Sequence, residues 1–197
     1  MGDTKERILD KALTLFSVRG YDGVSMSDIA GAVGIKAASI YKHYSGKEDI
    51  FYRIVQRFEE KTGSIFDPVL PGGSEYVDIS LETLVHMVQQ TFQLYAEEPF
   101  ISKCRKLFLI SSFNRAEIGD LYARYFIETP MQYQAGIFET ILKAKALEGR
   151  DTAVMAYHFY TPILILLQEY DYNNITMEDA LKKIELLVDQ FREVYGL

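Results

Sequence analysis

Apolar residues recur along most of the chain with the 3.6-residue period of an amphipathic α-helix. The first pattern predicts a helix over Thr4–Arg19, and two short helices follow over Met26–Val33 and Lys36–Tyr44. Gly34 separates the two short helices, because a glycine readily ends a helix. The chain therefore begins with one long helix and a closely spaced pair of short ones.

Two capping patterns mark helix starts in the same region. Ser25 and Asp28 form a weak capping box at the start of the second helix. Ser45 and Glu48 form the S-x-x-E pattern and predict the start of a fourth helix. The apolar stripe of that helix consists of Ile50, Phe51, Ile54, Val55 and Phe58.

The remainder also reads as helical. Helices are expected over Glu75–Glu97, Pro99–Phe113, Ala116–Leu147, Asp151–Tyr170 and Thr176–Tyr195. Gly119 and Pro130 are expected to break or kink the third of these. The period-2 alternation of β-strands does not occur in the sequence. The fold class is therefore predicted to be all-α.

A loop-like segment divides the chain. Gly63–Ser74, "GSIFDPVLPGGS", holds two prolines and three glycines, which are typical of loops. We place the domain boundary here. The prediction is a domain over residues 1–62 and a second helical domain over residues 63–197.

Charge is distributed unevenly between these parts. The net charge is −7, yet residues 1–61 hold 10 basic and 9 acidic side chains. The segment from Ile29 to Lys47 contains no acidic residue. Its basic side chains are Lys36, Lys42, His43 and Lys47. This local excess of positive charge favours an anionic partner.

The chain lacks the features of secreted and membrane proteins. Its single cysteine, Cys104, cannot form an intrachain disulfide, which fits a reducing cytoplasm. No stretch approaches the ~18 uncharged apolar residues of a spanning helix. We therefore expect a cytoplasmic protein without a membrane partner.

The short helices and their turn indicate a helix-turn-helix motif behind a supporting helix. An α-helix fits the major groove of DNA, which is about 12 Å wide. The alternative is that a lysine-rich helical face is simply solvated. The combination of helix lengths, turn and missing acidic residues favours double-stranded DNA as the partner.

Several spaced residues in this region resemble the DNA-binding domain of the TetR (tetracycline-repressor) family of bacterial transcriptional regulators. The resemblance spans about residues 5–58. The matching residues are Gly20-Tyr21, Ser25, Asp28-Ile29-Ala30, Val33-Gly34-Ile35, Tyr41, His43-Tyr44 and Lys47-Glu48. Lys36 and Ala37 depart from the pattern, since Ser or Thr is common at the first position and a longer polar residue often reads bases from the second.

The resemblance implies a role for each matching position. The groove-facing residues would be Ser27, Lys36, Ala37 and Ser39. The phosphate contacts would be Ser25, Tyr41, His43 and Lys47, and Lys42 is added from its charge and position. Lys47 occupies the first turn of a helix, where the dipole disfavours a cation, so we expect an external phosphate beside it.

The last two helices carry more apolar surface than one neighbour needs. The final helix has a continuous apolar stripe, and the helix before it is apolar nearly all round. A homodimer is expected, because a single half-site gives little affinity. Candidate interface residues are Tyr157, Leu164, Leu181, Ile184, Val188 and Phe191. The alternative is that both helices fill a monomeric core.

The second domain is rich in aromatic residues, with 19 Phe and Tyr over residues 63–197. Buried tyrosines need partners for their hydroxyls, so a cavity with polar groups is one interpretation and a packed core is the other. The resemblance implies a small apolar or amphipathic effector that releases a repressor from a palindromic operator. Candidate lining residues are Phe92, Tyr95, Cys104, Phe108, Tyr122, Phe126, Tyr133 and His158. A regulator controlled by a protein partner, or without ligand, is the second hypothesis.

Catalytic patterns do not occur in the sequence. His43, His86 and His158 are scattered without metal-ligand spacing. Cys104 has no nucleophile signature around it, and no P-loop lysine follows "PGGS". We expect no enzymatic activity, no metal and no cofactor.

Overall fold

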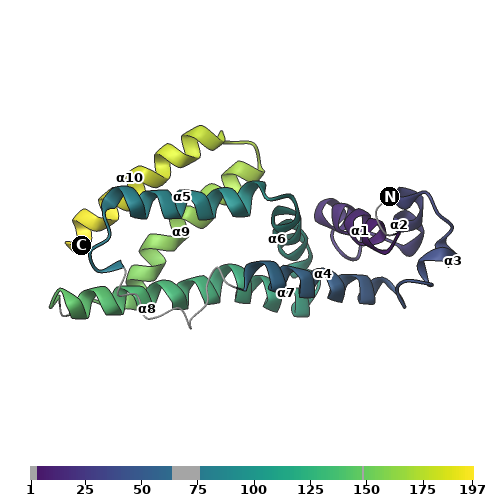
Figure 1. Ribbon diagram of the computed structural model, residues 1–197, viewed down its shortest axis with the longest axis horizontal. Helices are drawn as coiled ribbons and strands as arrows, with labels where there is room; N and C mark the ends of the chain where they lie inside the picture. The colour runs from purple at the N-terminus through teal and green to yellow at the C-terminus, as the bar shows by residue number, and fades with distance from the viewer. Residues whose placement is uncertain (1–3, 64–75, 148) are drawn as a thin grey trace. The chain divides into compact units, whose positions relative to one another are not determined.

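The computed structural model describes residues 4–63, 76–147 and 149–197, and this part of the chain contains helices and turns but no β-strand (Figure 1). The all-α prediction is confirmed. The helices are α1 (Thr4–Arg19), α2 (Met26–Val33), α3 (Ala37–Ile40), α4 (Lys47–Thr62), α5 (Leu81–Glu97), α6 (Pro99–Ser112), α7 (Ala116–Ala123), the π-helical turn η2 (Arg124–Glu128), α8 (Thr129–Ala144), α9 (Thr152–Asp171) and α10 (Met177–Tyr195).

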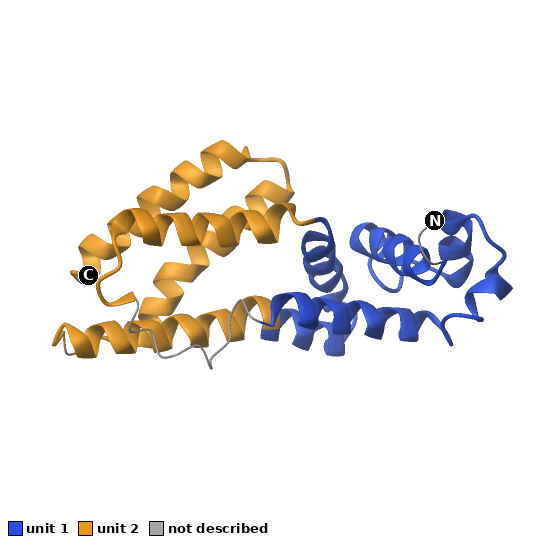
Figure 2. Ribbon diagram, viewed as in Figure 1, with its two compact units in different colours: residues 1–65, 99–124 blue, residues 66–98, 125–197 orange. Residues whose placement is uncertain are grey.

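The helices form two compact units (Figure 2). Unit 1 comprises Met1–Ile65 and Pro99–Arg124, and unit 2 comprises Phe66–Glu98 and Tyr125–Leu197. Thus α6 and α7 pack with the N-terminal helices, although they lie beyond residue 62. Apart from Gly63, the predicted boundary loop lies outside the described residues. The functional division into residues 1–62 and 63–197 stays a prediction.

The start of α2 confirms one of the capping predictions. The Ser25 hydroxyl accepts a hydrogen bond from the Asp28 N–H at 3.1 Å, and the Asp28 carboxylate accepts one from the Ser25 N–H at 2.8 Å. Gly34 ends the helix with φ of 79°, a left-handed conformation that glycine adopts without steric cost. Both ends of α2 are therefore encoded locally.

Two predictions beside α2 are corrected. The helix expected over Lys36–Tyr44 is shorter, because the chain turns after Ile40 and the His43 N–H donates to the Ile40 carbonyl at 2.8 Å. The capping box expected at Ser45 is wrong. Gly46 is the N-cap of α4, and the Ser45 N–H donates to the Asp49 carboxylate at 2.9 Å instead of to Glu48.

The later helices follow the predicted pattern with one further difference. Helix α5 begins after its N-cap Ser80 rather than at Glu75. The predicted helix over Ala116–Leu147 is divided by η2 just before Pro130, where a break or kink was expected, whereas α7 continues through Gly119. Pro130 has no N–H to donate to the Phe126 carbonyl four residues earlier. The Tyr160 hydroxyl donates to that carbonyl at 2.9 Å instead.

Each unit has its own aromatic core. In unit 1, Phe108 of α6 packs edge-on against Phe51 and Phe58 of α4, with ring centroids 6.2 and 5.5 Å apart. This packing explains why α6 belongs to unit 1. In unit 2, the rings of Phe138, Phe159 and Phe191 lie within 5.6 Å of one another, centroid to centroid.

Candidate nucleic-acid interface

Helix α3 has only four residues, and its position depends on contacts with the helices around it. One helical turn is unstable by itself in water, since helix nucleation is unfavourable. Ile40 is fully buried and anchors the inner side of α3. The outer side and the turn that follows carry the candidate DNA-contacting residues.

Two hydrogen bonds with α1 hold the chain on either side of α3. The Arg7 guanidinium donates to the Val33 carbonyl at 2.9 Å, directly before the Gly34 turn. The Tyr44 hydroxyl donates to the Lys5 carbonyl at 3.0 Å, shortly after α3 ends. The segment between these bonds is thus held at both ends against the supporting helix.

A third attachment comes from Lys47, at the start of α4. Its Nζ donates to the carbonyls of Tyr21 and Val24, both at 2.9 Å, and lies 4.3 Å from the centroid of the Tyr21 ring. Burial lowers the pKa of Lys47. Two backbone carbonyls therefore compensate this cation within the protein, and a phosphate contact by Lys47 stays a prediction. We use the term reading head for α2, α3 and the turn over residues 41–46. We call Lys47 the carbonyl clamp, because it binds the two carbonyls in the turn before α2.

Ser25 is likewise engaged within the protein. Its hydroxyl both accepts from the Asp28 N–H and donates to the Asp28 carboxylate. These bonds from Ser25, with a smaller contribution from Arg19, hold the pKa of Asp28 at about 2. A phosphate contact by the Ser25 hydroxyl would require it to leave Asp28.

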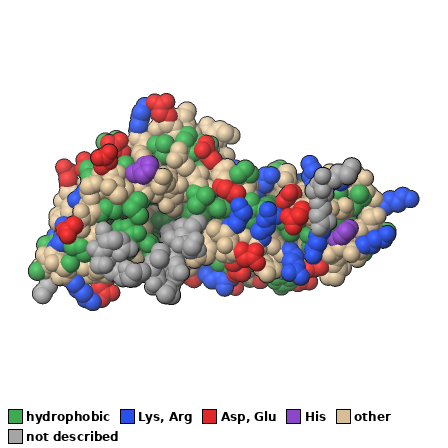
Figure 3. Space-filling model, in the orientation of Figure 1, with side chains coloured by type: hydrophobic (Ala, Val, Ile, Leu, Met, Phe, Trp, Pro, Cys, Tyr) green, Lys and Arg blue, Asp and Glu red, His purple; other side chains and the backbone are tan. Residues whose placement is uncertain are grey.

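The remaining candidates face outward from the reading head. Tyr41 is 57 % exposed, Ser27, Lys36 and Lys42 are exposed, and Ala37, Ser39 and His43 are half-buried. Within the described ranges, the polar side chains of this group form no hydrogen bond or ion pair with another residue. Figure 3 shows basic side chains and a histidine over the end of unit 1 that carries α3. This group can therefore bind an external anion without breaking an internal contact.

The candidate effector-binding residues do not lie together in one unit. Cys104, Phe108 and Tyr122 belong to unit 1, and the first two are buried in its core. Phe92, Tyr95 and Phe126 are buried in unit 2, where the rings of Tyr95 and Phe126 pack edge-on at 5.7 Å. Burial raises the pKa of Tyr95. Tyr133 is half-buried, and its hydroxyl shares a hydrogen bond with that of Tyr76 at 3.1 Å.

His158 is not in the aromatic interior. It is exposed on α9, and its Nδ1 is hydrogen-bonded to the Tyr195 hydroxyl of α10. Its place among the effector-binding residues stays a prediction, and it is not buried with the aromatic candidates.

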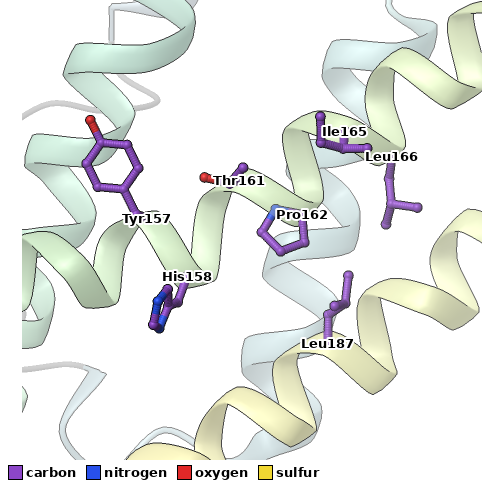
Figure 4. Close-up of a pocket in the computed structure, with 7 residues that line it drawn as sticks. All are labelled: Tyr157, His158, Thr161, Pro162, Ile165, Leu166 and Leu187. Carbon is purple, nitrogen blue, oxygen red and sulfur yellow. The ribbon is translucent and has the colours of Figure 1, made fainter.

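An open apolar groove runs along α9 and reaches Leu187 of α10 (Figure 4). Its lining residues are Tyr157, His158, Thr161, Pro162, Ile165, Leu166 and Leu187. The candidate interface residue Tyr157 is 57 % exposed here, and Leu164 and Leu181 are half-buried. Ile184, Val188 and Phe191 are buried inside unit 2, so their assignment to a partner-facing surface is corrected. The exposed Ile165 and Leu186 were not among the predicted interface residues.

In the described residues, no helix has the length and apolar character needed to cross a membrane. No cluster of His, Cys, Asp and Glu in the same ranges is suited to a metal ion. The notable chemistry of unit 1 is therefore the outward-facing polar and basic group around α3.

A short α2–α3 pair with a left-handed glycine turn, braced by α1 and α4, defines a helix-turn-helix protein. Comparison with known proteins identifies the N-terminal segment. Residues 8–54 match the family model described as "Bacterial regulatory proteins, tetR family". This segment is therefore similar to the part of that family which the model describes.

Curated relatives match only the N-terminal part. The biofilm operon icaADBC HTH-type negative transcriptional regulator IcaR of Staphylococcus epidermidis is 50% identical over 52 residues, which is 26% of this chain and 28% of the relative. The match thus spans little more than a quarter of that protein's length.

Solved structures match nearly the whole fold. MexZ, a repressor from Pseudomonas aeruginosa, has a TM-score of 0.73 and 14% identity, covering 99% of this chain and 96% of that chain. A cysteine mutant of the TetR family regulator CifR, complexed with a 26 bp operator DNA, has a TM-score of 0.67 and 18% identity, covering 93% and 94%. At these identities the similarity concerns the fold.

Proposed function

We propose that this chain is a cytoplasmic, homodimeric repressor that binds a palindromic operator and is released by a small apolar or amphipathic molecule. The observation that carries the proposal is the reading head itself. The side chains of Ser27, Lys36, Ser39, Tyr41, Lys42 and His43 form no hydrogen bond or ion pair in the described part of the chain. Arg7 and Tyr44 attach the reading head to α1, and Lys47 binds the turn before α2. An arrangement of this kind is suited to insertion into a major groove.

The outward-facing side chains of the reading head divide into two groups, those placed to contact phosphates and those placed to contact base edges. Tyr41, Lys42 and His43 follow α3, and they would bind phosphates and position the protein on the duplex. Lys36, at the N-cap of α3, can donate to guanine O6 and N7. Ser27, Ala37 and Ser39 would approach base edges, and the methyl of Ala37 could contact a thymine methyl.

Dimerisation through α9 and α10 is supported by their exposed apolar side chains. Leu186 and Val194 of α10 are 69 % and 67 % exposed, and Ile165 of α9 is 49 % exposed. Ile165 also lines the apolar groove that reaches Leu187 of α10, and exposed apolar patches mark interaction sites in proteins. A second copy of the chain is the natural occupant, because a two-fold dimer presents two reading heads to a palindrome.

Release by a small molecule is proposed from the interior of unit 2. Unit 2 buries Phe92, Tyr95 and Phe126 and brings the hydroxyls of Tyr76 and Tyr133 together, so it combines apolar surface with polar groups. The close ring packing of Tyr95 on Phe126 favours the second candidate, a regulator without a ligand. Repression is proposed because IcaR is named a negative regulator.

Selection of bound duplexes from a random pool, followed by sizing of the complex, tests the proposal. We expect a palindromic consensus bound by two protomers, with affinity falling steeply as salt rises. Recovery of no sequence at low salt would refute operator binding. A thermal-shift screen of small apolar compounds, repeated with operator present, tests release: the compound should stabilise the free protein and dissociate the complex.

A further inference from the structure

The turn between α1 and α2, residues 20–24, is held by residues far away in the sequence. The Tyr21 N–H donates to the Ser111 hydroxyl of α6 at 2.9 Å. Gly20 has φ of 69°, and a Cβ there would lie 3.2 Å from Cγ2 of Ile110. A glycine is therefore required by both the conformation and the close approach of α6.

Arg115, the N-cap residue of α7, binds the same turn, because its guanidinium donates hydrogen bonds to the Asp22 carboxylate. Its Nε donates to both carboxylate oxygens of Asp22 at 3.1 Å, and its Nη2 donates to Oδ1 at 2.7 Å. Its guanidinium carbon also lies 5.3 Å from the centroid of the Tyr21 ring. Two donor nitrogens on one planar group, with three contacts between them, restrict the orientation of Asp22 more than a single contact would.

The turn then connects to the reading head through the carbonyl clamp. Lys47 binds the carbonyls of Tyr21 and Val24, and Val24 directly precedes Ser25, the N-cap of α2. Tyr21 thus lies against two cations, Arg115 and Lys47, at 5.3 and 4.3 Å from its ring centroid. Asp22 supplies the negative charge that offsets them. The chain of contacts runs from α7, through the turn, to the starts of α2 and α4.

We propose that Arg115 is a positioning residue for operator binding. It fixes the turn over residues 20–24, and this turn sets the position of α2 and, through Lys47, of the start of α4. The inference rests on the proposed DNA-binding function, and it assigns a part in that function to a residue outside the matched segment 8–54. Arg115 acts through Asp22 and Tyr21, without touching DNA.

The test compares three variants. Arg115→Met removes the fork and the charge, whereas Arg115→Lys retains the charge but not the planar fork. The matched control is Arg57→Met. Like Arg115, Arg57 pairs with acidic side chains, in its case Glu6 and Asp10 of α1, and its guanidinium lies 4.8 Å from the centroid of the Phe100 ring. Unlike Arg115, it does not bind the turn over residues 20–24.

Two measurements are made on each full-length variant, with folding verified by circular dichroism. The first is the affinity for a selected operator duplex over a series of salt concentrations. We expect Arg115→Met to weaken binding about tenfold, the scale of coupling within one hydrogen-bonded network, with the salt slope unchanged. Arg115→Lys should be intermediate, and Arg57→Met should bind like the wild type.

The second measurement is amide hydrogen exchange over residues 20–24. Arg115→Met should lose protection there, and Arg57→Met should not. Unchanged affinity or unchanged protection in Arg115→Met would overturn the inference, as would equal weakening by Arg57→Met. A smaller salt slope in Arg115→Met would mean a direct phosphate contact and would also overturn it. Failure of the wild type to bind any duplex would instead refute the proposed function.

Discussion

Replacing Lys47 with methionine distinguishes two roles of this residue: stabilising the turn through the two carbonyls, and binding a DNA phosphate. The substitution keeps most of the aliphatic stem beside the Tyr21 ring and removes the two hydrogen bonds to the Tyr21 and Val24 carbonyls. Hydrogen bonds to charged groups contribute about 1.5–3 kcal/mol each. Lys47 is half-buried, so water replaces part of what is lost, and we take about 2–3 kcal/mol for the pair.

The effect is measured by urea and thermal unfolding, both followed by circular dichroism because the chain has no tryptophan. For a chain of this length, each kcal/mol lowers the thermal midpoint by about 2–4 °C, so a decrease of roughly 5–10 °C is expected. The control is Lys42→Met, whose exposed side chain has no partner in the described ranges. Its stability should change by less than about 0.5 kcal/mol.

Operator binding gives the opposite pattern for the two variants. Lys42→Met should reduce the slope of log affinity against log salt by about 0.9 for each protomer, since one phosphate contact is lost. Lys47→Met should weaken binding through the displaced turn while leaving the slope unchanged. Wild-type stability together with a reduced slope in Lys47→Met would refute the clamp and restore the phosphate contact expected from the sequence.

Tyr41→Ala should weaken binding to all duplexes about equally, whereas Lys36→Ala should change the preference among operators. Gel shifts with a panel of sequences measure both effects. Unchanged affinity in both variants would contradict the assignment of these residues to the DNA interface. Because the folded pKa of Asp28 is about 2 and its ordinary value is 3.8, its contribution is fully present above pH 3.8 and disappears as pH falls through 2. The difference in urea midpoint between wild type and Asp28→Asn should therefore shrink over that window, and a constant difference would exclude the linkage. Ile165→Glu should give monomers in sedimentation experiments, since a carboxylate would be buried at the proposed interface; an unchanged dimer would locate the interface elsewhere.

Local signals explain why the first helices were predicted well. Helix α2 matches its predicted bounds because Ser25, Asp28 and Gly34 determine its ends through hydrogen bonds within a few residues. Where two acidic residues compete, the local pattern is ambiguous. At the start of α4 the Ser45 N–H donates its hydrogen bond to Asp49 and not to Glu48. The N-cap is Gly46, so the helix begins one residue later than the capping pattern predicted.

Long-range contacts account for what the sequence did not reveal. The Arg115–Asp22 and Ser111–Tyr21 contacts join residues 93 and 90 positions apart, and no periodic pattern connects them. Nor could the sequence distinguish Lys47, which points to carbonyls inside unit 1, from the outward-facing Lys42. The apolar stripe of α10 also did not show which of its residues a partner could reach, since Ile184 is buried within unit 2.

Chemical probing of guanine N7 on a selected operator tests the central claim most directly, because this atom lies in the major groove. We predict protection in two half-sites whose centres are about one helical turn or a multiple of it apart, with two protomers bound per duplex. Saturating binding that leaves every guanine N7 reactive, or protection of a single site by one protomer, would contradict the account.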